Sequence, residues 1–280
     1  CSATAANTRG SAWGARPAPR PAGGGWGGGA PAPPPPPAAR RGVYPRGAGG
    51  GGGLVVPGAY APAAAPGAGG AAHADPRVFA AVALHPTRAG ALDTAAQAEL
   101  ERLAADPRTV AVGETGLDYY WPGKLEGCAD VETQIEAFRW HIDLAKRVRK
   151  PLMIHNREAD HDLLTVLLDE GAPPTVIFHC FSSDTNMALS CVDEGYILSF
   201  SGTVSFKNAH ELREAATVVP DGQILVETDA PYLTPHPFRG APNEPYCLPY
   251  TVRALAELRG QDPVELAKIT TANARRVYGI

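Results

Sequence analysis

Residues 109–158 read TVAVGETGLDYYWPGKLEGCADVETQIEAFRWHIDLAKRVRKPLMIHNRE. Short apolar runs open and close this segment, at 109–113 and 151–155. Between them, residues 131–149 place apolar side chains at helical spacing, namely Ile135, Phe138, Ile142, Ala145 and Val148. The first turn of this predicted helix is acidic and the last is basic, as the helix dipole favours. The segment therefore predicts a parallel strand–helix–strand unit whose strands are covered on both faces.

The same alternation of short apolar runs and helical periods fills the chain from residue 75 onward. Six strands are expected, at Phe79–Leu84, Thr109–Gly113, Pro151–His155, Thr175–His179, Tyr196–Phe200 and Gln223–Glu227. A leucine stripe at 163–168 predicts another helix, and Asp262 and Pro263 are placed to begin a last one. Because no glycine-rich phosphate loop follows a strand, a TIM-type (β/α) barrel is favoured over a dinucleotide-binding sheet. A full barrel has eight strands, so we expect its first two regular β/α units to be missing.

Residues 1–74 have a different composition from the rest. They hold 19 of the 31 Gly and 13 of the 28 Pro, six Arg, and no Asp, Glu or Lys. Such a tract buries too little apolar surface to offset its chain entropy. We therefore expect a disordered, low-complexity segment at 1–74, in which Leu54–Val56 is too short to count as a strand, and one folded domain at 75–280.

Composition also excludes several classes of protein. The longest apolar runs, such as 78–84, are far too short to span a bilayer. The five cysteines are an odd number without paired spacing, which suits a reducing cytoplasm better than a disulfide framework. Residues 75–280 carry 29 acidic and 19 basic side chains, a balance unlike that of a duplex-binding surface. No membrane contact and no obligate protein partner are indicated.

Polar side chains stand where the predicted strands end. Glu114, His155 and His179 each follow or end an apolar run, and Glu227 and Asp229 follow the last one. In a (β/α) barrel the chemistry sits at these carboxyl ends of the strands. Two imidazoles and several carboxylates on one rim form a nitrogen and oxygen site for a divalent metal ion, with no thiolate required.

The other histidines and the central cysteines have simpler expected roles. His85, before Pro86, is expected only to begin the loop after its strand. The rest are expected as follows: His141, His161 and His210 as surface or packing residues on helices, His236 as a residue of the rim, and Cys180 and Cys191 as small apolar side chains.

Taken together, several motifs resemble the TatD family of metal-dependent deoxyribonucleases. These motifs are GETGLDYY (113–120), PLMIHNRE (151–158), FHCFSSD (178–184), SFSGTVSFKNA (199–209), ETDAPYLTPHPFRGAPNEP (227–245) and TTANARRVYG (270–279). The resemblance runs from VFAAVALHP (78–86) to the C-terminus. It implies a TIM barrel of the amidohydrolase type, with one or two divalent ions (Mg²⁺, Mn²⁺ or Zn²⁺) at the strand ends. It also implies 3′-directed nuclease activity on DNA, sometimes RNA, with single strands or strand ends as the substrate.

The resemblance implies a role for each strand-end residue. Glu114 is expected to bridge two metal ions, and His155 and His179 to complete the ligands of the second metal. Asp229 is expected to bind the first metal and to orient or deprotonate the attacking water, so Asp229 and Glu114 are the expected catalytic residues. The family's first strand ends in His-x-His, which occurs nowhere in this sequence. We therefore expect weaker binding at the first metal position and lower activity than in an intact relative.

Residues 1–74 stand where the family has its first two β/α units, and they resemble nothing in it. The chain opens with Cys1 and not Met, and Ala, Gly, Pro and Arg share GC-rich codons. The hypothesis that follows is an out-of-frame or mis-started translation joined to a genuine remainder.

Substrate contacts are expected near the metal ligands. Arg157, two residues after His155, could bind a phosphate with its planar group or pair with a carboxylate, and both uses remain open. Ser182 and Asn243 are further candidates for substrate contact. Asp118 and Glu227 are expected to support ligand histidines from behind.

Two other functions remain open at this point. One is an amidohydrolase-type enzyme that cleaves a different ester or an amide, although Glu114, in place of a carbamylated Lys, favours the nuclease. The other is a non-catalytic remnant, in which an incomplete barrel exposes apolar edges.

Overall fold

The computed structural model describes Gly58–Ala59, Gly70 and residues 72–280. In this part of the chain, seven parallel strands lie side by side in the order in which they occur in the sequence. They are β1 (Gly58–Ala59), β2 (Ala80–Val82), β3 (Thr109–Asp118), β4 (Leu152–Arg157), β5 (Val176–Phe178), β6 (Ile197–Phe200) and β7 (Ile224–Val226). Most of the expected tract at 1–74, including Leu54–Val56, lies outside the described residues.

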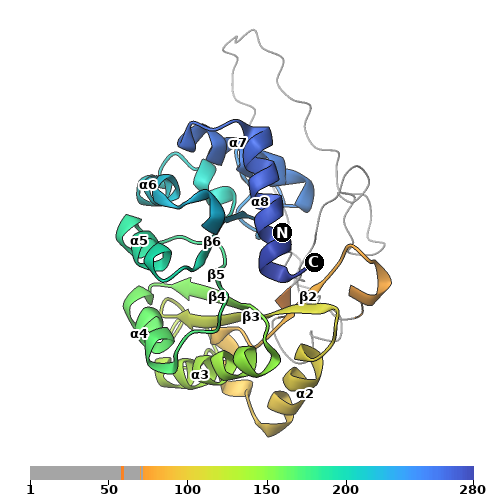
Figure 1. Cartoon of the computed structure of the whole chain (residues 1–280). Helices are drawn as coiled ribbons and strands as arrows, with labels where there is room; N and C mark the ends of the chain where they lie inside the picture. The colour runs from red at the N-terminus through yellow and green to blue at the C-terminus, as the bar shows by residue number, and fades with distance from the viewer. Residues whose placement is uncertain (1–57, 60–69, 71) are drawn as a thin grey trace, which may run out of the picture.

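The helices among the described residues are α2 (Thr94–Ala104), α3 (Val131–Val148), α4 (Asp160–Glu170), α5 (Thr185–Asp193), α6 (His210–Val218), α7 (Leu248–Arg259) and α8 (Pro263–Tyr278). Helices α2 to α7 lie along the outside of the sheet, whereas the last helix, α8, packs Val277 against Ile177, Ile197 and Leu225 of the strands (Figure 1). Short 3₁₀ turns occur at η2 (Pro86–Ala91), η3 (Gly202–Ser205), η4 (Asp221–Gln223) and η5 (Pro245–Cys247). The predicted cap of the last helix is present, since Asp262 accepts hydrogen bonds from the backbone of Val264 and Glu265.

The strands form the centre of the hydrophobic core. Every residue of β2, β3, β5, β6 and β7 is buried, as near-continuous apolar runs predict for strands covered on both faces. The fully buried rings of Phe138, Phe178 and Phe200 fill the space between sheet and helices. This parallel α/β arrangement confirms the predicted TIM-type fold class.

Two strands differ from the prediction. β1, which the sequence analysis missed, pairs with β2 through Gly58 and Ala81. β3 continues to Asp118, five residues past the predicted end at Gly113. It can do so because Gly116, with φ of 137°, lets the backbone approach β4: an added Cβ would lie 2.1 Å from the carbonyl oxygen of His155.

None of the described helices is both long and apolar enough to cross a lipid bilayer. The four cysteines among the described residues are free thiols. Cys191 is buried, as expected of a small apolar side chain, and Cys180 donates from Sγ to the hydroxyl of Ser201 at 3.2 Å.

Candidate metal centre

Side chains from five strands meet at the carboxyl end of the parallel sheet. They are His85 (after β2), Glu114 and Asp118 (in β3), His155 (in β4), His179 (after β5), and Glu227 and Asp229 (after β7). The register between β3 and β4 shifts between Val112 and Thr115, on either side of Glu114. Such an irregularity re-aims a side chain, and here it affects the carboxylate at the centre of the group.

Glu114 lies at the centre of a first group with two histidines. Its Oε1 lies 2.7 Å from Nδ1 of His155 and 3.6 Å from Nε2 of His85. The two imidazole nitrogens are 3.3 Å apart. One ligand atom from each of the three residues lies within 4.8 Å of the others, so the group is compact enough to hold a metal ion.

A second group consists of His179, Glu227 and Asp229, and it meets the same distance criterion. Nδ1 of His179 lies 2.9 Å from Glu227 Oε1, and Nε2 lies 3.5 Å from Asp229 Oδ1. Nε2 of His179 is also 3.9 Å from Glu114 Oε1, so Glu114 stands between the two groups. The four predicted ligands, Glu114, His155, His179 and Asp229, are therefore brought together by contacts of 3.9 Å or less.

Asp118 and Glu227 lie behind the histidines, where they were expected. Asp118 Oδ2 accepts from Nε2 of His155 at 3.0 Å. Glu227 Oε2 lies 3.0 Å from Nδ1 of His179 and accepts a second hydrogen bond from the hydroxyl of Ser199 at 2.6 Å. These contacts fix the orientation of both imidazole rings.

Burial and mutual charge shift the pKa values of the whole cluster. Burial acts to raise the pKa of Glu114, but the surrounding imidazoles, His179 first, hold it well below its usual range. Burial acts to lower the pKa of His155, but Asp118 and Glu114 raise it to about 9. Glu227 and Glu114 likewise outweigh burial and raise the pKa of His179 well above its usual value.

The raised pKa values of His155 and His179 have one cause, which is that buried carboxylates favour positive charge beside them. Burial instead raises the pKa of Asp229, and burial together with the neighbouring His155 lowers the pKa of His85 to about 3. The donor set, all nitrogen and oxygen and partly held by imidazolium protons, fits a divalent cation that would displace those protons.

The three predicted substrate residues have different surroundings. The exposed guanidinium of Arg157 lies over the Tyr120 ring, 3.9 Å from its centroid, and forms no ion pair with a described carboxylate. Asn243 is buried and donates to the carbonyl oxygens of Thr228 and Tyr232, so it braces the loop after β7 and does not face solvent. Ser182 is exposed and makes no hydrogen bond with a described residue.

His85, which was expected only to begin the loop after its strand, also belongs to the cluster. It does cap η2, where its side chain accepts from the amide of Thr87. Its other ring nitrogen faces Glu114 and His155 inside the cluster. The signal was present, because His85 follows an apolar run in the same way as His155 and His179 do.

Comparison with known proteins agrees with this geometry. The sequence profile described as TatD related DNase matches residues 45–279, beginning upstream of the motifs at 78–86. A protein of Mycobacterium tuberculosis named "Uncharacterized metal-dependent hydrolase TatD" is 70% identical over 210 residues, which cover 75% of this chain and 80% of that protein. A protein of Erwinia billingiae named "3'-5' ssDNA/RNA exonuclease TatD" is 35% identical over 202 residues, 70% of this chain and 75% of that one.

A solved structure is similar as well. The crystal structure of YJJV, a TatD homologue from Escherichia coli K12, superposes with a TM-score of 0.75 at 26% identity, over 81% of this chain and 87% of that one. Profile, relatives and fold agree: this chain belongs to the TatD-related DNase family and is a metal-dependent hydrolase.

Proposed function

We propose that this hydrolase removes nucleotides from the 3′ end of single-stranded DNA or RNA by hydrolysing phosphodiester bonds. One observation carries the proposal: Glu114 lies between two groups of imidazoles and carboxylates, within 3.9 Å of ring nitrogens of His85, His155 and His179. That arrangement suits a pair of divalent ions, which stabilise attacking and leaving oxygens in phosphodiester hydrolysis.

The proposed metal ligands are Glu114, His155, His179 and Asp229, with His85 as a fifth donor. Mixed carboxylate and imidazole donors accept Mg²⁺, Mn²⁺ or Zn²⁺. When bound, such ions neutralise charge on the phosphate oxygens and lower the pKa of a coordinated water. Glu114 contributes to both groups, and Asp118 and Glu227 keep His155 and His179 in position.

Asp229 is the proposed proton acceptor for the attacking water. Its side chain is 17% exposed, against 9% for Glu114 and 5% for Glu227, so it is the most accessible of these three carboxylates. A general base must reach the proton it removes, and Asp229 combines this access with a place in the second group.

Aromatic and cationic side chains beside the cluster support a nucleic-acid substrate. Tyr120 and Trp121 lie two and three residues after Asp118, and their rings meet edge to face at 4.9 Å. Arg157 lies over both rings, and Nζ of Lys124 lies 3.9 Å from the Tyr120 centroid. Aromatic faces combined with cations are the usual means of holding a single strand. The acidic balance of residues 75–280 favours such local contact over duplex binding.

The proposal includes a cytoplasmic location, supported by the free thiols of the four described cysteines. Ser182 remains a proposed substrate contact on account of its exposed place in the loop after β5.

A nuclease assay on end-labelled single strands tests the function. We expect stepwise shortening from the 3′ end with added Mg²⁺ or Mn²⁺, and none with a chelator. Asp229→Asn should abolish cleavage, whereas Asp169→Asn, which removes an exposed carboxylate paired with Arg139 on the outside of the sheet, should not. Failure of the metal-loaded protein to cleave any single strand refutes the proposal, and equal activity in Asp229→Asn identifies a contaminant.

A further inference from the structure

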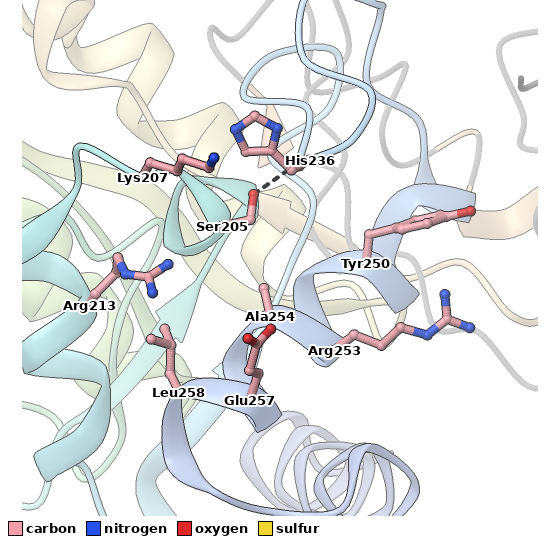
Figure 2. Close-up of a pocket in the computed structure, with 9 residues that line it drawn as sticks. All are labelled: Ser205, Lys207, Arg213, His236, Tyr250, Arg253, Ala254, Glu257 and Leu258. Carbon is pink, nitrogen blue, oxygen red and sulfur yellow. Dashed lines mark hydrogen bonds between the residues drawn. The ribbon is translucent and has the colours of Figure 1, made fainter. Parts of the chain in front are cut away.

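A hollow of about 400 Å³ lies beyond β6, between η3, α6 and α7 (Figure 2). Its lining includes Lys207, Arg213, His236, Arg253 and Glu257. η3 directly follows β6, and His236 comes seven residues after Asp229. The hollow is therefore on the same end of the sheet as the metal centre, and no residue of that centre lines it.

The hollow carries an excess of positive charge. Lys207 and Arg213 extend into it from one side, and Arg253 lies on α7 at the other (Figure 2). None of the three forms an ion pair with a described carboxylate, and the only hydrogen bond from the side chain of Arg213 to a described residue is to the carbonyl of Val204, at 3.4 Å. Even with Glu257 counted, the lining remains cationic. Such a concentration of charge in a domain that is acidic overall attracts an anion.

Aromatic groups accompany the cations. The ring of His236 meets Phe206 edge to face at 6.2 Å, and the guanidinium of Arg239 lies 3.8 Å over the same Phe206 ring. Tyr250 lines the hollow and packs edge to face on Phe238 at 4.8 Å. Cations along a groove with aromatic faces between them are the composition of sites that bind a single nucleic-acid strand.

The segment between Asp229 and His236 joins the metal centre to the hollow, and it is fixed by two contacts. Ser205 accepts a hydrogen bond from the backbone of His236 at 2.9 Å, as Figure 2 shows. Gly202 packs so closely beneath the same segment that an added Cβ would lie 2.2 Å from the carbonyl of Leu233. The segment that leads from Asp229 to His236 is therefore held against η3.

We propose that this hollow binds backbone phosphates of the substrate strand on the 5′ side of the cleaved bond. The proposal rests on the proposed nuclease function and extends it. The strand end lies at the metal centre with Arg157 and Tyr120 on the β3–β4 side, and the remaining strand passes over the β6–β7 side into the hollow. Strands long enough to reach Lys207, Arg213 and Arg253 bind more tightly than shorter ones.

Kinetics on strands of increasing length test the proposal. The full chain is loaded with Mn²⁺, and KM and kcat are measured on substrates from a dinucleotide up to about 16 nucleotides, the span of single-strand grooves. A small synthetic phosphodiester without a strand serves as a parallel substrate. The test variant is Lys207→Gln/Arg253→Gln, both exposed side chains. Its control is Arg102→Gln/Arg147→Gln, which removes the same charge from α2 and α3, away from α6 and α7 (Figure 1).

We expect KM to fall with strand length in the wild type. In the double variant, KM should no longer fall with length, whereas kcat and cleavage of the small diester should stay unchanged. The dependence of binding on salt should weaken by about one unit of slope for each cation removed. Glu257→Gln should act in the opposite direction and lower KM for long strands only. The control should match the wild type.

Other results overturn the proposal. If the double variant keeps the wild-type KM at every length, the hollow does not hold the strand, although the nuclease function stands. If calorimetry shows that the variant loses binding of inorganic phosphate with no change in KM, the hollow is a site for a free anion. If the wild type cleaves the small diester but no strand, the nuclease function itself fails, and this proposal fails with it.

Discussion

His155 donates from Nε2 to Oδ2 of Asp118 across 3.0 Å. The other oxygen of Asp118 accepts from the backbone amides of Tyr120 and Trp121, at 3.0 and 3.1 Å. The carboxylate is therefore fixed by the turn after β3, and it in turn fixes the ring that faces Glu114. Asp118 can position a metal ligand without touching metal or substrate.

Asp118→Asn should weaken divalent-metal binding about 10- to 100-fold, the usual cost of losing the outer partner of a ligand histidine. The amide keeps an oxygen for the two backbone N–H groups, so the fold should be retained. Titration calorimetry with Mn²⁺ measures the change. Asp143→Asn, which removes a carboxylate paired with Arg147 on the outside of α3, is the matched control. Equal affinity in Asp118→Asn and wild type would mean that this carboxylate only caps the turn.

Metal titration of the wild type should show two sites of unequal strength. One group offers two imidazoles and Glu114, whereas the other offers the single imidazole of His179 with Asp229, because Glu227 holds the opposite side of that ring. His85→Ala should weaken one class of site and leave the other. Nδ1 of His85 lies 2.8 Å from the hydroxyl of Thr87, and this contact holds the ring with Nε2 facing Glu114. Two equally tight sites, or no effect of His85→Ala, would contradict the expected difference.

The positions of residues at the ends of the strands explain how much of the metal centre could be predicted from the sequence. Parallel strands in consecutive order bring their carboxyl ends to one edge, so Glu114, His155, His179 and Asp229 could be placed together from their positions after apolar runs. His85 obeys the same rule, but Pro86 after it also signals a loop, and a single sequence gives no means of weighing the two.

Other features depend on contacts between distant segments. The continuation of β3 past Gly113 requires Gly116 to pack against the backbone of His155, a contact made 39 residues away in the sequence. Asn243 was expected to contact the substrate, yet it is buried and donates to the carbonyl oxygens of Thr228 and Tyr232. A sequence pattern indicates which residues can form a strand. It does not indicate which side-chain amide of a loop becomes buried.

Arg157→Lys should raise KM for single strands about two- to fivefold, the equivalent of the roughly 0.5–1 kcal/mol of an exposed cation–π contact. Lysine keeps the charge but loses the planar group that lies on Tyr120 and can bind a phosphate through two hydrogen bonds. Tyr120→Phe keeps the aromatic face and should behave as wild type, whereas Tyr120→Ala should resemble Arg157→Lys. Steady-state kinetics on a labelled strand separates KM from kcat, and identical KM values in all four proteins would rule out this phosphate contact.

His141 should make the stability of the fold depend on pH. It is fully buried in α3, where Nδ1 donates to the carbonyl of Ala137 at 2.6 Å and Nε2 accepts from the backbone of Leu84 at 3.1 Å. This site holds only the neutral ring, and burial lowers the pKa of His141 from 6.5 to about 4. The unfolded chain therefore gains a proton near pH 6.5, whereas the native protein does not until about pH 4.

The stabilisation from neutral His141 is therefore complete above pH 6.5 and is lost as the pH falls toward 4, by about 3 kcal/mol in total. Urea unfolding of the metal-free protein between pH 7 and 4 measures the loss. His141→Gln should be less stable at pH 7 but should decline less steeply, because one proton-binding difference has been removed. His161→Gln, an exposed residue of α4, should keep the wild-type slope. A slope that is equally steep in His141→Gln would assign the loss to the buried carboxylates of the metal centre instead.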